Sequence, residues 1–158
     1  MKNTIENLSV SYDHFVENPL LLDENITPVM FHKRYDLPNP LGLSSEDFNS
    51  WDELETYLKK SFKNIQKVYM YDHSGLALRT EPFPDQWDSG VVGFLCSDRY
   101  EDMSEDLQLF EHYINGSCYL IEVNEDFYTV FGYGELLTEL EEVHECTGDE
   151  IAELIRTI

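Results

Sequence analysis

Short segments in which apolar and polar residues alternate begin the chain and predict β-strands, because successive side chains of a strand point to opposite faces. The first such segment is 7–12, and a second, 28–35, is followed by Pro38 and Pro40. Proline removes a backbone donor and ends regular pairing. We therefore expect extended segments and loops through residues 1–40.

Two β-hairpins and one buried strand are predicted further along. The first hairpin turns at Asp72-His73-Ser74-Gly75, whose polar residues and closing glycine are typical of a tight turn. The segment 91–96 is continuously apolar, as expected of a strand buried on both faces. The predicted strand pairs are 67–71 with 76–80 and 118–123 with 127–131.

Four stretches place apolar residues three or four positions apart, which predicts short amphipathic helices. Two of them begin with capping boxes, Ser50 with Glu53 and Thr147 with Glu150. A third helix is expected to be capped by Ser104. The apolar positions are Trp51, Leu54 and Leu58; Leu107, Phe110 and Tyr113; Leu136, Leu137, Leu140 and Val143; and Ile151 and Leu154.

Together these elements predict an α+β fold. We expect a single domain over residues 1–158, with an antiparallel sheet of about five or six strands and about three or four short helices. Extended segments are expected at 1–40, the core of the sheet at 65–134 and acidic helices at 135–158.

The composition is that of a folded protein. Hydrophobic residues make up 42% of the 158 residues and aromatic residues 13%, so disorder is not expected despite a formal net charge of −22. No apolar run approaches the ~20 residues of a transmembrane helix, and the N-terminus lacks the apolar core of a signal peptide, so we expect a cytoplasmic protein. The odd number of cysteines (Cys96, Cys118 and Cys146) fits a reducing compartment.

The negative charge is concentrated toward the C-terminus. Residues 1–97 hold 15 acidic and 8 basic residues, whereas residues 98–158 hold 17 acidic residues and only Arg99 and Arg156 as cations. We therefore expect one strongly negative face. Its sign disfavours binding to nucleic acids and to anionic membranes.

Catalytic and metal-binding patterns are weak. Asp72-His73-Ser74 has the residue types of a hydrolytic triad, but neighbours in a tight turn point in different directions, and Asp and Ser favour turns through local backbone hydrogen bonds. A divalent cation bound by Asp72, Asp85 and Asp88 would lack the spacing of an EF-hand. No His and Cys spacing completes a tetrahedral zinc site, and there is no glycine-rich phosphate loop. We expect no catalytic residues, no metal and no cofactor.

Two acidic runs, residues 98–111 and 135–153, differ from ordinary protein surfaces, because almost no Lys or Arg is interspersed among their acids. On a helix, acids three or four apart repeat every ~5–6 Å, a separation similar to that of phosphates along a DNA strand. Carboxylates at this spacing can pair with the Lys and Arg side chains that a nuclease uses to bind DNA. We therefore predict a partner-binding surface. Its residues are Asp98, Glu101, Asp102, Glu105, Asp106, Glu111, Glu135, Glu139, Glu141, Glu142, Glu145, Asp149, Glu150 and Glu153.

One part of the chain resembles a known group of proteins. The string Val68-Tyr69-Met70-Tyr71-Asp72-His73-Ser74-Gly75, then Pro82-Phe83 and Trp87-Asp88-Ser89-Gly90-Val91-Val92-Gly93-Phe94, resembles small proteins of bacteriophages and bacterial mobile elements with a YDHSG…PF…WDSGxVG pattern. Tyr113-Ile114-Asn115-Gly116 and Phe131-Gly132-Tyr133-Gly134 are similar to later segments of that family. The resemblance covers residues 65–134 and implies a viral or mobile gene. It implies no activity, so the YDHSG and WDSG segments gain no catalytic role from it.

In composition the chain is similar to the acidic DNA mimics that counter restriction and CRISPR defence. The leading hypothesis is a phage-encoded, non-enzymatic inhibitor that occupies the DNA-binding site of a restriction enzyme or of a CRISPR effector nuclease, such as the PAM-reading groove of the Cas9 type. Its expected partner is a basic DNA-binding protein of the host, and self-association is left open. Two alternatives are a small metal-dependent hydrolase using Asp72, His73, Asp85 and Asp88, and an acidic adaptor of a basic host protein unrelated to defence.

Overall fold

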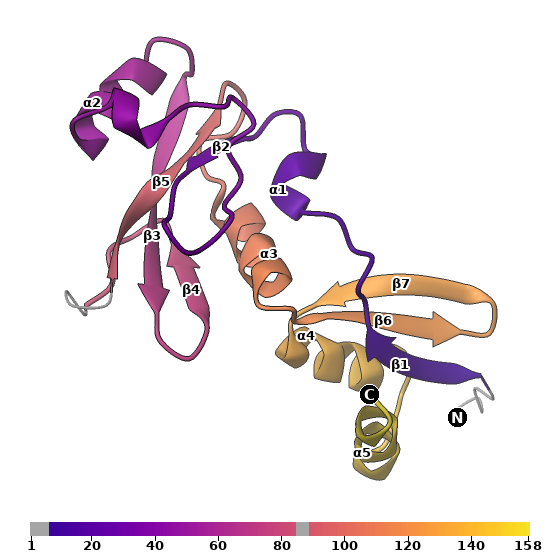
Figure 1. The fold of residues 1–158 in the computed structure, drawn as a ribbon. Helices are drawn as coiled ribbons and strands as arrows, with labels where there is room; N and C mark the ends of the chain where they lie inside the picture. Colours follow the sequence, from indigo (N-terminus) through magenta and orange to yellow (C-terminus); the bar gives the residue numbers. More distant parts are fainter. Residues whose placement is uncertain (1–6, 85–88) are drawn as a thin grey trace. The chain divides into compact units, whose positions relative to one another are not determined.

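The computed structural model describes residues 7–84 and 89–158, and Figure 1 shows its helices and strands. The chain divides into two compact units, a terminal unit from Met1–Val16 and His112–Ile158 and a central unit from Glu17–Glu111. Every strand pairing among the described residues is antiparallel. Helices accompany both sheets, so the predicted α+β class is confirmed.

A four-stranded sheet forms the core of the central unit. Its strands are β2 (Thr27–Met30), β3 (Asn64–Asp72), β4 (Leu76–Arg79) and β5 (Ser89–Ser97). They are ordered β2-β5-β3-β4, with the predicted hairpin between β3 and β4. The predicted buried strand is the interior strand β5, whose residues 92–97 are all buried. This burial on both faces explains why the segment is continuously apolar.

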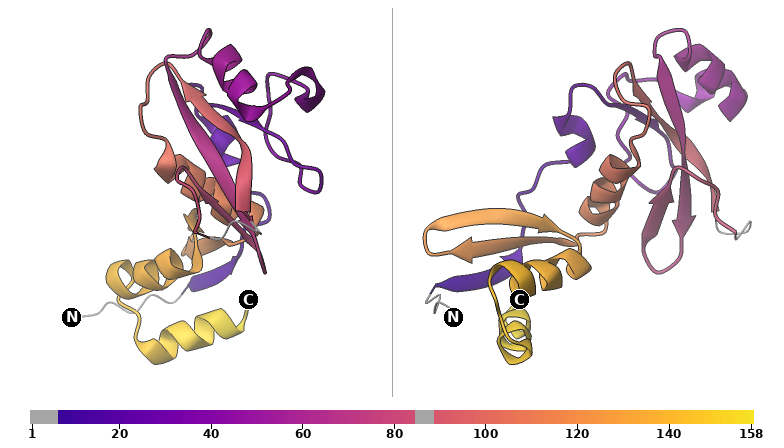
Figure 2. Two further views of the ribbon diagram at one scale, coloured as in Figure 1. Left: turned by 90° about the vertical axis from the view of Figure 1, so that its left-hand side faces the viewer. Right: turned by 180° about the vertical axis from the view of Figure 1, so that it is seen from behind.

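Helices lie on both faces of this sheet, as Figures 1 and 2 show. On one face, Leu54 and Leu58 pack against Val29 and Phe94. On the other face, Leu20, Leu107 and other apolar side chains are fully buried. The helices of the central unit are α1 (Pro19–Leu22), the short 3₁₀ helix η1 (Ser45–Asp47), α2 (Trp51–Leu58) and α3 (Ser104–Ile114).

The start of α3 differs from the expectation. Ser104 is the first residue of the helix rather than its cap. Asp102 accepts the Ser104 N–H at 3.0 Å, and the Gln66 side chain accepts the Met103 N–H at 2.6 Å. The predicted Ser104 cap is therefore wrong, because side chains from the preceding loop and from β3 take the backbone donors of the first turn.

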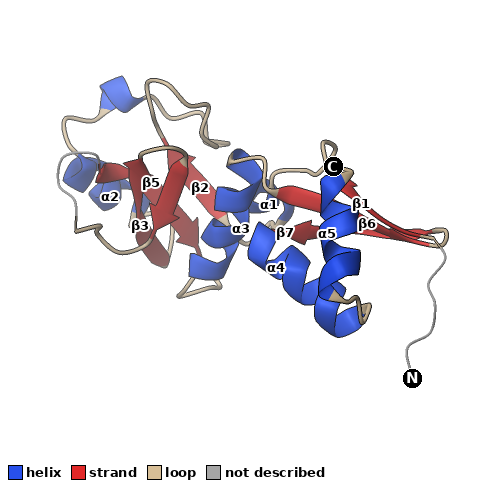
Figure 3. Cartoon of the chain, turned by 90° about the horizontal axis from the view of Figure 1, so that it is seen from below, coloured by secondary structure: helices blue, strands red, loops and turns tan. Residues whose placement is uncertain are grey.

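A three-stranded sheet forms the terminal unit, with the predicted hairpin between its last two strands. Its elements are β1 (Leu8–Tyr12), β6 (Cys118–Val123), β7 (Asp126–Phe131), α4 (Tyr133–Thr138), the π-helical turn η2 (Glu139–Val143) and α5 (Gly148–Arg156). The strands are ordered β1-β6-β7, and the helices lie on one face (Figure 3). Leu136 and Leu140 are fully buried against Ile121 and its neighbours, so one face of the sheet carries the core.

The predicted capping box of the last helix is confirmed. Thr147 Oγ1 accepts the Glu150 N–H at 3.2 Å, and Glu150 Oε1 accepts the Thr147 N–H at 3.0 Å. Ile151 and Leu154 pack against the core of the terminal unit, as their spacing predicts. The cap therefore fixes where α5 begins, and its two apolar residues fix which side of it faces the sheet.

The strands form two sheets where the sequence led us to expect one. The strands within 65–134 divide between the two units, and the extended segments of 1–40 supply one strand to each. β1 pairs with β6, more than 100 residues later, and β2 pairs with β5. Hairpin signals identify only strands that are neighbours in sequence, so these long-range pairings had no signal in the pattern.

Candidate functional site

The fourteen acids predicted to form one surface fall on both units. Asp98, Glu101, Asp102, Glu105, Asp106 and Glu111 belong to the central unit, and the other eight belong to α4, η2, α5 and the turn between the last two. The terminal unit has 13 acidic and two basic residues, a net charge of −11; the central unit has 19 acidic and eight basic residues, also −11. The terminal unit carries this charge on 63 residues against 95, so its charge density is the higher.

Several acids of the central unit have structural roles. Asp98 accepts the Lys63 N–H at 2.9 Å, and Glu111 accepts the Leu78 N–H at 2.9 Å. Asp102 accepts from Ser104 and Gln66, and these hydrogen bonds, that to the Ser104 backbone first, lower its pKa. The run also begins before α3, so the helical spacing assumed for it holds only from Glu105 onward. These acids are therefore weaker candidates for partner binding.

The acids of the terminal unit are mostly unengaged. Arg156 is the only Lys or Arg in the described part of this unit, and it pairs with Glu153 at 2.7 Å. Of the seven other acids that were predicted for the surface and lie in this unit, five are exposed and make no ion pair or side-chain hydrogen bond with a described residue. We call these five the C-terminal acidic surface: Glu135, Glu141, Glu142, Glu145 and Asp149.

Three members of this surface lie within a short segment of the chain, where η2 ends. Glu141 and Glu142 lie in the π-helical turn η2, and Glu145 lies in the following turn with φ at +55°. The chain turns there from η2 into α5, with His144 capping η2. A left-handed residue at this position reverses the chain and keeps the Glu145 side chain exposed. Three negative charges within five residues thus occupy one corner.

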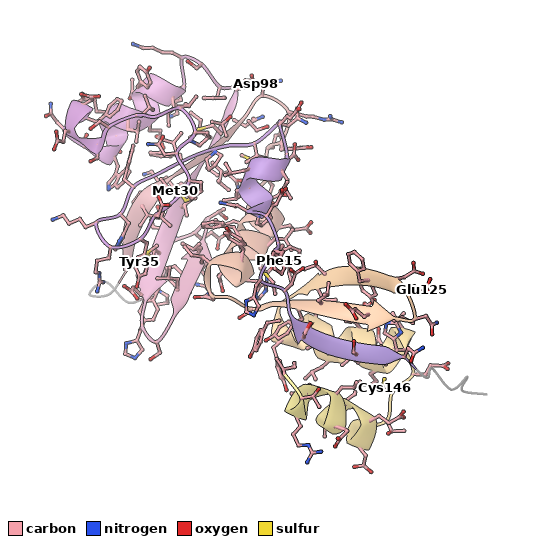
Figure 4. The ribbon with its side chains drawn as sticks, turned by 45° about the vertical axis from the view of Figure 1, so that its right-hand side comes forward. Phe15, Met30, Tyr35, Asp98, Glu125 and Cys146 are labelled. Carbon is pink, nitrogen blue, oxygen red and sulfur yellow. The ribbon has the colours of Figure 1, made fainter. Side chains whose placement is uncertain are left out.

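Sequence reasoning missed three further acids of the same unit. Glu122, Glu125 and Asp126 are exposed on the β6–β7 hairpin, and Figure 4 shows Glu125 at its turn. The surface was predicted from acids at helical spacing, whereas these three acids lie on strands or at the hairpin turn. The absence of any Lys or Arg in 118–131 was the signal that could have identified them.

A hydrogen-bonded network joins η2 to the sheet. Tyr128 of β7 donates its hydroxyl to Glu139 Oε1 at 2.8 Å, and the Tyr128 hydroxyl oxygen also lies 2.7 Å from Nε2 of the buried His144. A phenol has only one proton to donate, so His144 carries its proton on Nε2 and donates to Tyr128. Burial, and then the hydrogen bond to Glu139, raise the pKa of Tyr128. Glu139 is therefore a positioning residue for the acidic helices rather than a free surface charge.

Replacing Tyr128 by Phe should destabilise the terminal unit by about 1–3 kcal/mol, because it leaves Glu139 and buried His144 without their shared partner. The raised pKa of Tyr128 means that the folded state holds the phenol proton more tightly. Its stabilisation is present below the ordinary tyrosine pKa of ~10 and is lost as pH rises above it. Urea unfolding of both proteins near neutral and at alkaline pH measures both effects. The exposed Tyr133→Phe is the matched control, and equal losses for the two variants would contradict the role of the network.

The Asp72-His73-Ser74 segment adopts the turn expected of it. Asp72 accepts from Arg34 Nη2 at 2.7 Å and from the Tyr35 hydroxyl at 3.0 Å, and the hydrogen bond to Asp72 raises the pKa of Tyr35. His73 and Ser74 are exposed, and no hydrogen bond joins the three described side chains to one another. Asp72 therefore holds the loop that contains Arg34 and Tyr35.

The metal-binding alternative gains no support from the described residues. Asp85, Trp87 and Asp88 lie outside them, and no group of three His, Cys, Asp or Glu side chains that could hold a metal ion is found in 7–84 and 89–158. Cys96, Cys118 and Cys146 are buried thiols, and burial raises the pKa of Cys96 to about 12 and that of Cys118 to about 11. Such thiols are poor nucleophiles near neutral pH, because the thiolate is the reactive form.

Searches with family models, against curated proteins and against solved structures each found no match to this chain. In the part of the chain that the structure describes, no helix is both long and apolar enough to cross a membrane. The charge and geometry of the described residues are therefore what point to a function.

Proposed function

We propose that this protein is a phage-encoded anti-defence protein that mimics DNA. It acts in the bacterial cytoplasm, without catalysis, by occupying the DNA-binding site of a restriction enzyme or a CRISPR effector nuclease. The observation that carries the proposal is the C-terminal acidic surface: five exposed carboxylates with no cation against them, in a unit whose only described Lys or Arg is already paired.

The first support is energetic. Like charges close together on a surface cost stability, and ordinary protein surfaces avoid this by interspersing Lys and Arg. The terminal unit keeps 13 acidic residues against two basic ones in 63 residues. Binding of a cationic partner relieves this repulsion. The repulsion in the free protein therefore adds to the favourable free energy of binding.

The second support is the rigidity of the scaffold. The helices that carry the acids pack on the sheet through Leu136 and Leu140 and are joined to it by the Tyr128 network. Carboxylates held on a rigid frame need little ordering when they meet arginines that already point into a DNA-binding groove. Pairs between carboxylates and Arg are charge-assisted and can be bidentate, which gives them both strength and direction.

The experiment is capture from bacterial lysate by the immobilised full-length protein at low and high salt. We expect the subunit of a DNA-binding nuclease to be recovered at low salt and lost as salt rises, because exchange of condensed ions drives such contacts. Purified nuclease should then fail to cleave DNA in the presence of the protein. Capture of a basic protein that does not bind DNA would instead identify an acidic adaptor and contradict the proposal.

A further inference from the structure

The strand β7 is an edge of the terminal sheet, and half of its backbone groups point away from that sheet. The Cys118 carbonyl accepts the Asp13 N–H at 2.9 Å, so the even-numbered residues of β6 bond to β1 and the odd-numbered ones to β7. Phe127, Thr129 and Phe131 stand opposite even-numbered residues of β6, so their N–H and C=O groups face outward. These outward backbone groups make no hydrogen bond with a described residue.

The two edges of the central sheet are protected in ways that β7 is not. On β2, Pro28 has no N–H, and the Pro38 carbonyl accepts the Met30 N–H at 3.2 Å. On β4, the Glu111 carboxylate accepts the Leu78 N–H at 2.9 Å. β7 has no Pro, Lys or Arg, and its six residues pair with β6 without a bulge. Edge strands usually carry such protection, so an edge that lacks it is suited to receive another strand.

The side chains of β7 differ between its two faces. Tyr128 packs into the core on the face that carries the helices of this unit, whereas Phe127 and Phe131 lie on the open face (Figure 3). Phe127 is 70% exposed. On the other edge strand, β1, the open face carries only Ser9 and Ser11. β7 is therefore the edge that offers apolar surface to a strand added beside it.

The charge of the terminal unit selects which strand can add to this edge. The β6–β7 hairpin exposes Glu122, Glu125 and Asp126, and no Lys or Arg lies in 118–131. Asp126 stands opposite Val123, so it lies on the same face as the acidic helices. The unit as a whole has a net charge of −11. A second copy of the chain would therefore be repelled from β7, whereas a cationic segment would be attracted.

We propose that β7 binds an extended cationic segment of the partner protein as a fourth strand of the terminal sheet. Residues of this segment opposite Phe127, Thr129 and Phe131 exchange backbone hydrogen bonds with them and place apolar side chains on the open face. The residues between them place Lys or Arg side chains on the face of the acidic helices. The segment is thus recognised by its backbone and by an alternation of apolar and cationic side chains. This inference rests on the proposed function only in that the partner is cationic.

The test is an NMR titration of the full-length protein with an eight-residue peptide of alternating Val and Lys with blocked ends. The backbone amide signals of Phe127, Thr129 and Phe131 are followed, together with their rates of hydrogen exchange. We expect saturable shifts and slower exchange at these three amides, because their N–H groups gain carbonyl partners. No saturable shift at these amides up to about 10 mM peptide, well above the Kd of a weak specific site, would overturn the proposal.

Two methylated peptides of the same charge separate strand addition from attraction of opposite charges. Methylation of the Val backbone nitrogens removes the N–H groups that bond to β7, whereas methylation of the Lys backbone nitrogens removes only N–H groups that point away. We expect the first peptide to bind at least about tenfold more weakly than the second. Equal affinities of the two peptides would show that charge alone attracts them and would contradict strand addition.

Protein variants test the same edge from the other side. Phe127→Lys should weaken binding of the unmethylated peptide at least about tenfold, because it replaces an apolar contact with a like charge. Phe15→Lys makes the same change at a phenylalanine that is 93% exposed and lies outside the sheet, so it should leave the affinity within about twofold. If Phe127→Lys fails to fold, the comparison of methylated peptides still decides, because it uses the unchanged protein.

Sedimentation of the free protein tests the competing occupant of this edge. We expect a monomer, because two terminal units of the same charge repel each other. A dimer that Phe127→Lys dissociates would assign β7 to a second copy and overturn the proposal. None of these measurements uses a nuclease. Failure to capture a nuclease therefore leaves the peptide result standing, and failure of the peptide to bind leaves the capture result standing.

Discussion

Reversing the three charges at the corner between η2 and α5, by changing Glu141, Glu142 and Glu145 to Lys, should abolish inhibition of the target nuclease. These side chains are exposed and make no ion pair or side-chain hydrogen bond with a described residue. Each attractive contact with a partner Arg or Lys would become a repulsive one, so we expect affinity to fall roughly 100-fold or more. The reversal also relieves repulsion within the unit, so the unfolding free energy should not decrease.

A matched control separates the position of the charges from their number. Glu17, Glu24 and Glu46 are exposed acids of the central unit, and changing all three to Lys alters the net charge by the same amount. Binding to the captured nuclease, measured for both triple variants at one salt concentration, gives the comparison. Equal weakening by the two variants would mean that overall charge, rather than the C-terminal acidic surface, carries the interaction.

Adding one methyl group at Gly93 should destabilise the central unit more than any surface change. A Cβ on Gly93 would lie 2.1 Å from the Val29 carbonyl oxygen and 2.6 Å from the Met30 Cα, both backbone atoms of the paired strand β2. Backbone in a hydrogen-bonded, buried ladder cannot move aside as a flexible side chain does. We expect Gly93→Ala to cost about 3 kcal/mol or more, a large part of the roughly 5–15 kcal/mol that stabilises a domain.

The same strand provides the control for this prediction. A Cβ on Gly90 would meet nothing within 4 Å, so Gly90→Ala should change stability by no more than about 0.5 kcal/mol. Urea unfolding of both variants, followed by far-ultraviolet circular dichroism, measures the difference. Similar unfolding midpoints for the two variants would show that β2 does not approach β5 as closely as the structure has it.

Local signals in the sequence predicted much of the fold. The turn at residues 72–75, the capping box at Thr147 and the apolar strand 91–96 each correspond to an observed element. Of the capping box predicted at Ser50, only the Ser50 cap is present, since the Glu53 carboxylate accepts the Asn49 N–H rather than that of Ser50. The short helix α1 and the division of the strands into two sheets were not predicted. Which distant strands pair depends on packing across the whole chain, and no local pattern in a single sequence encodes it.

The candidate site was predicted in part. The acids of α4, η2 and α5 were identified from their number and their helical spacing, but the sequence could not distinguish Glu139, which Tyr128 holds, from Glu141 and Glu142, which are exposed. That difference arises because β7 and η2 meet in space. A pocket of the central unit, lined by Phe31, Asn39 and Trp51, had no sequence signal, since its lining comes from residues with ordinary loop and core patterns.

The most direct test of the DNA-mimic account is competition between this protein and DNA for the captured nuclease. A fluorescent duplex is bound to the nuclease, the protein is titrated in, and the anisotropy is followed at several salt concentrations. The account predicts full displacement of the duplex, with the affinity of the protein falling roughly 100-fold or more between about 50 and 200 mM salt, as multiple carboxylate contacts require. A complex in which protein and duplex bind together, or an affinity that does not change with salt, would contradict it.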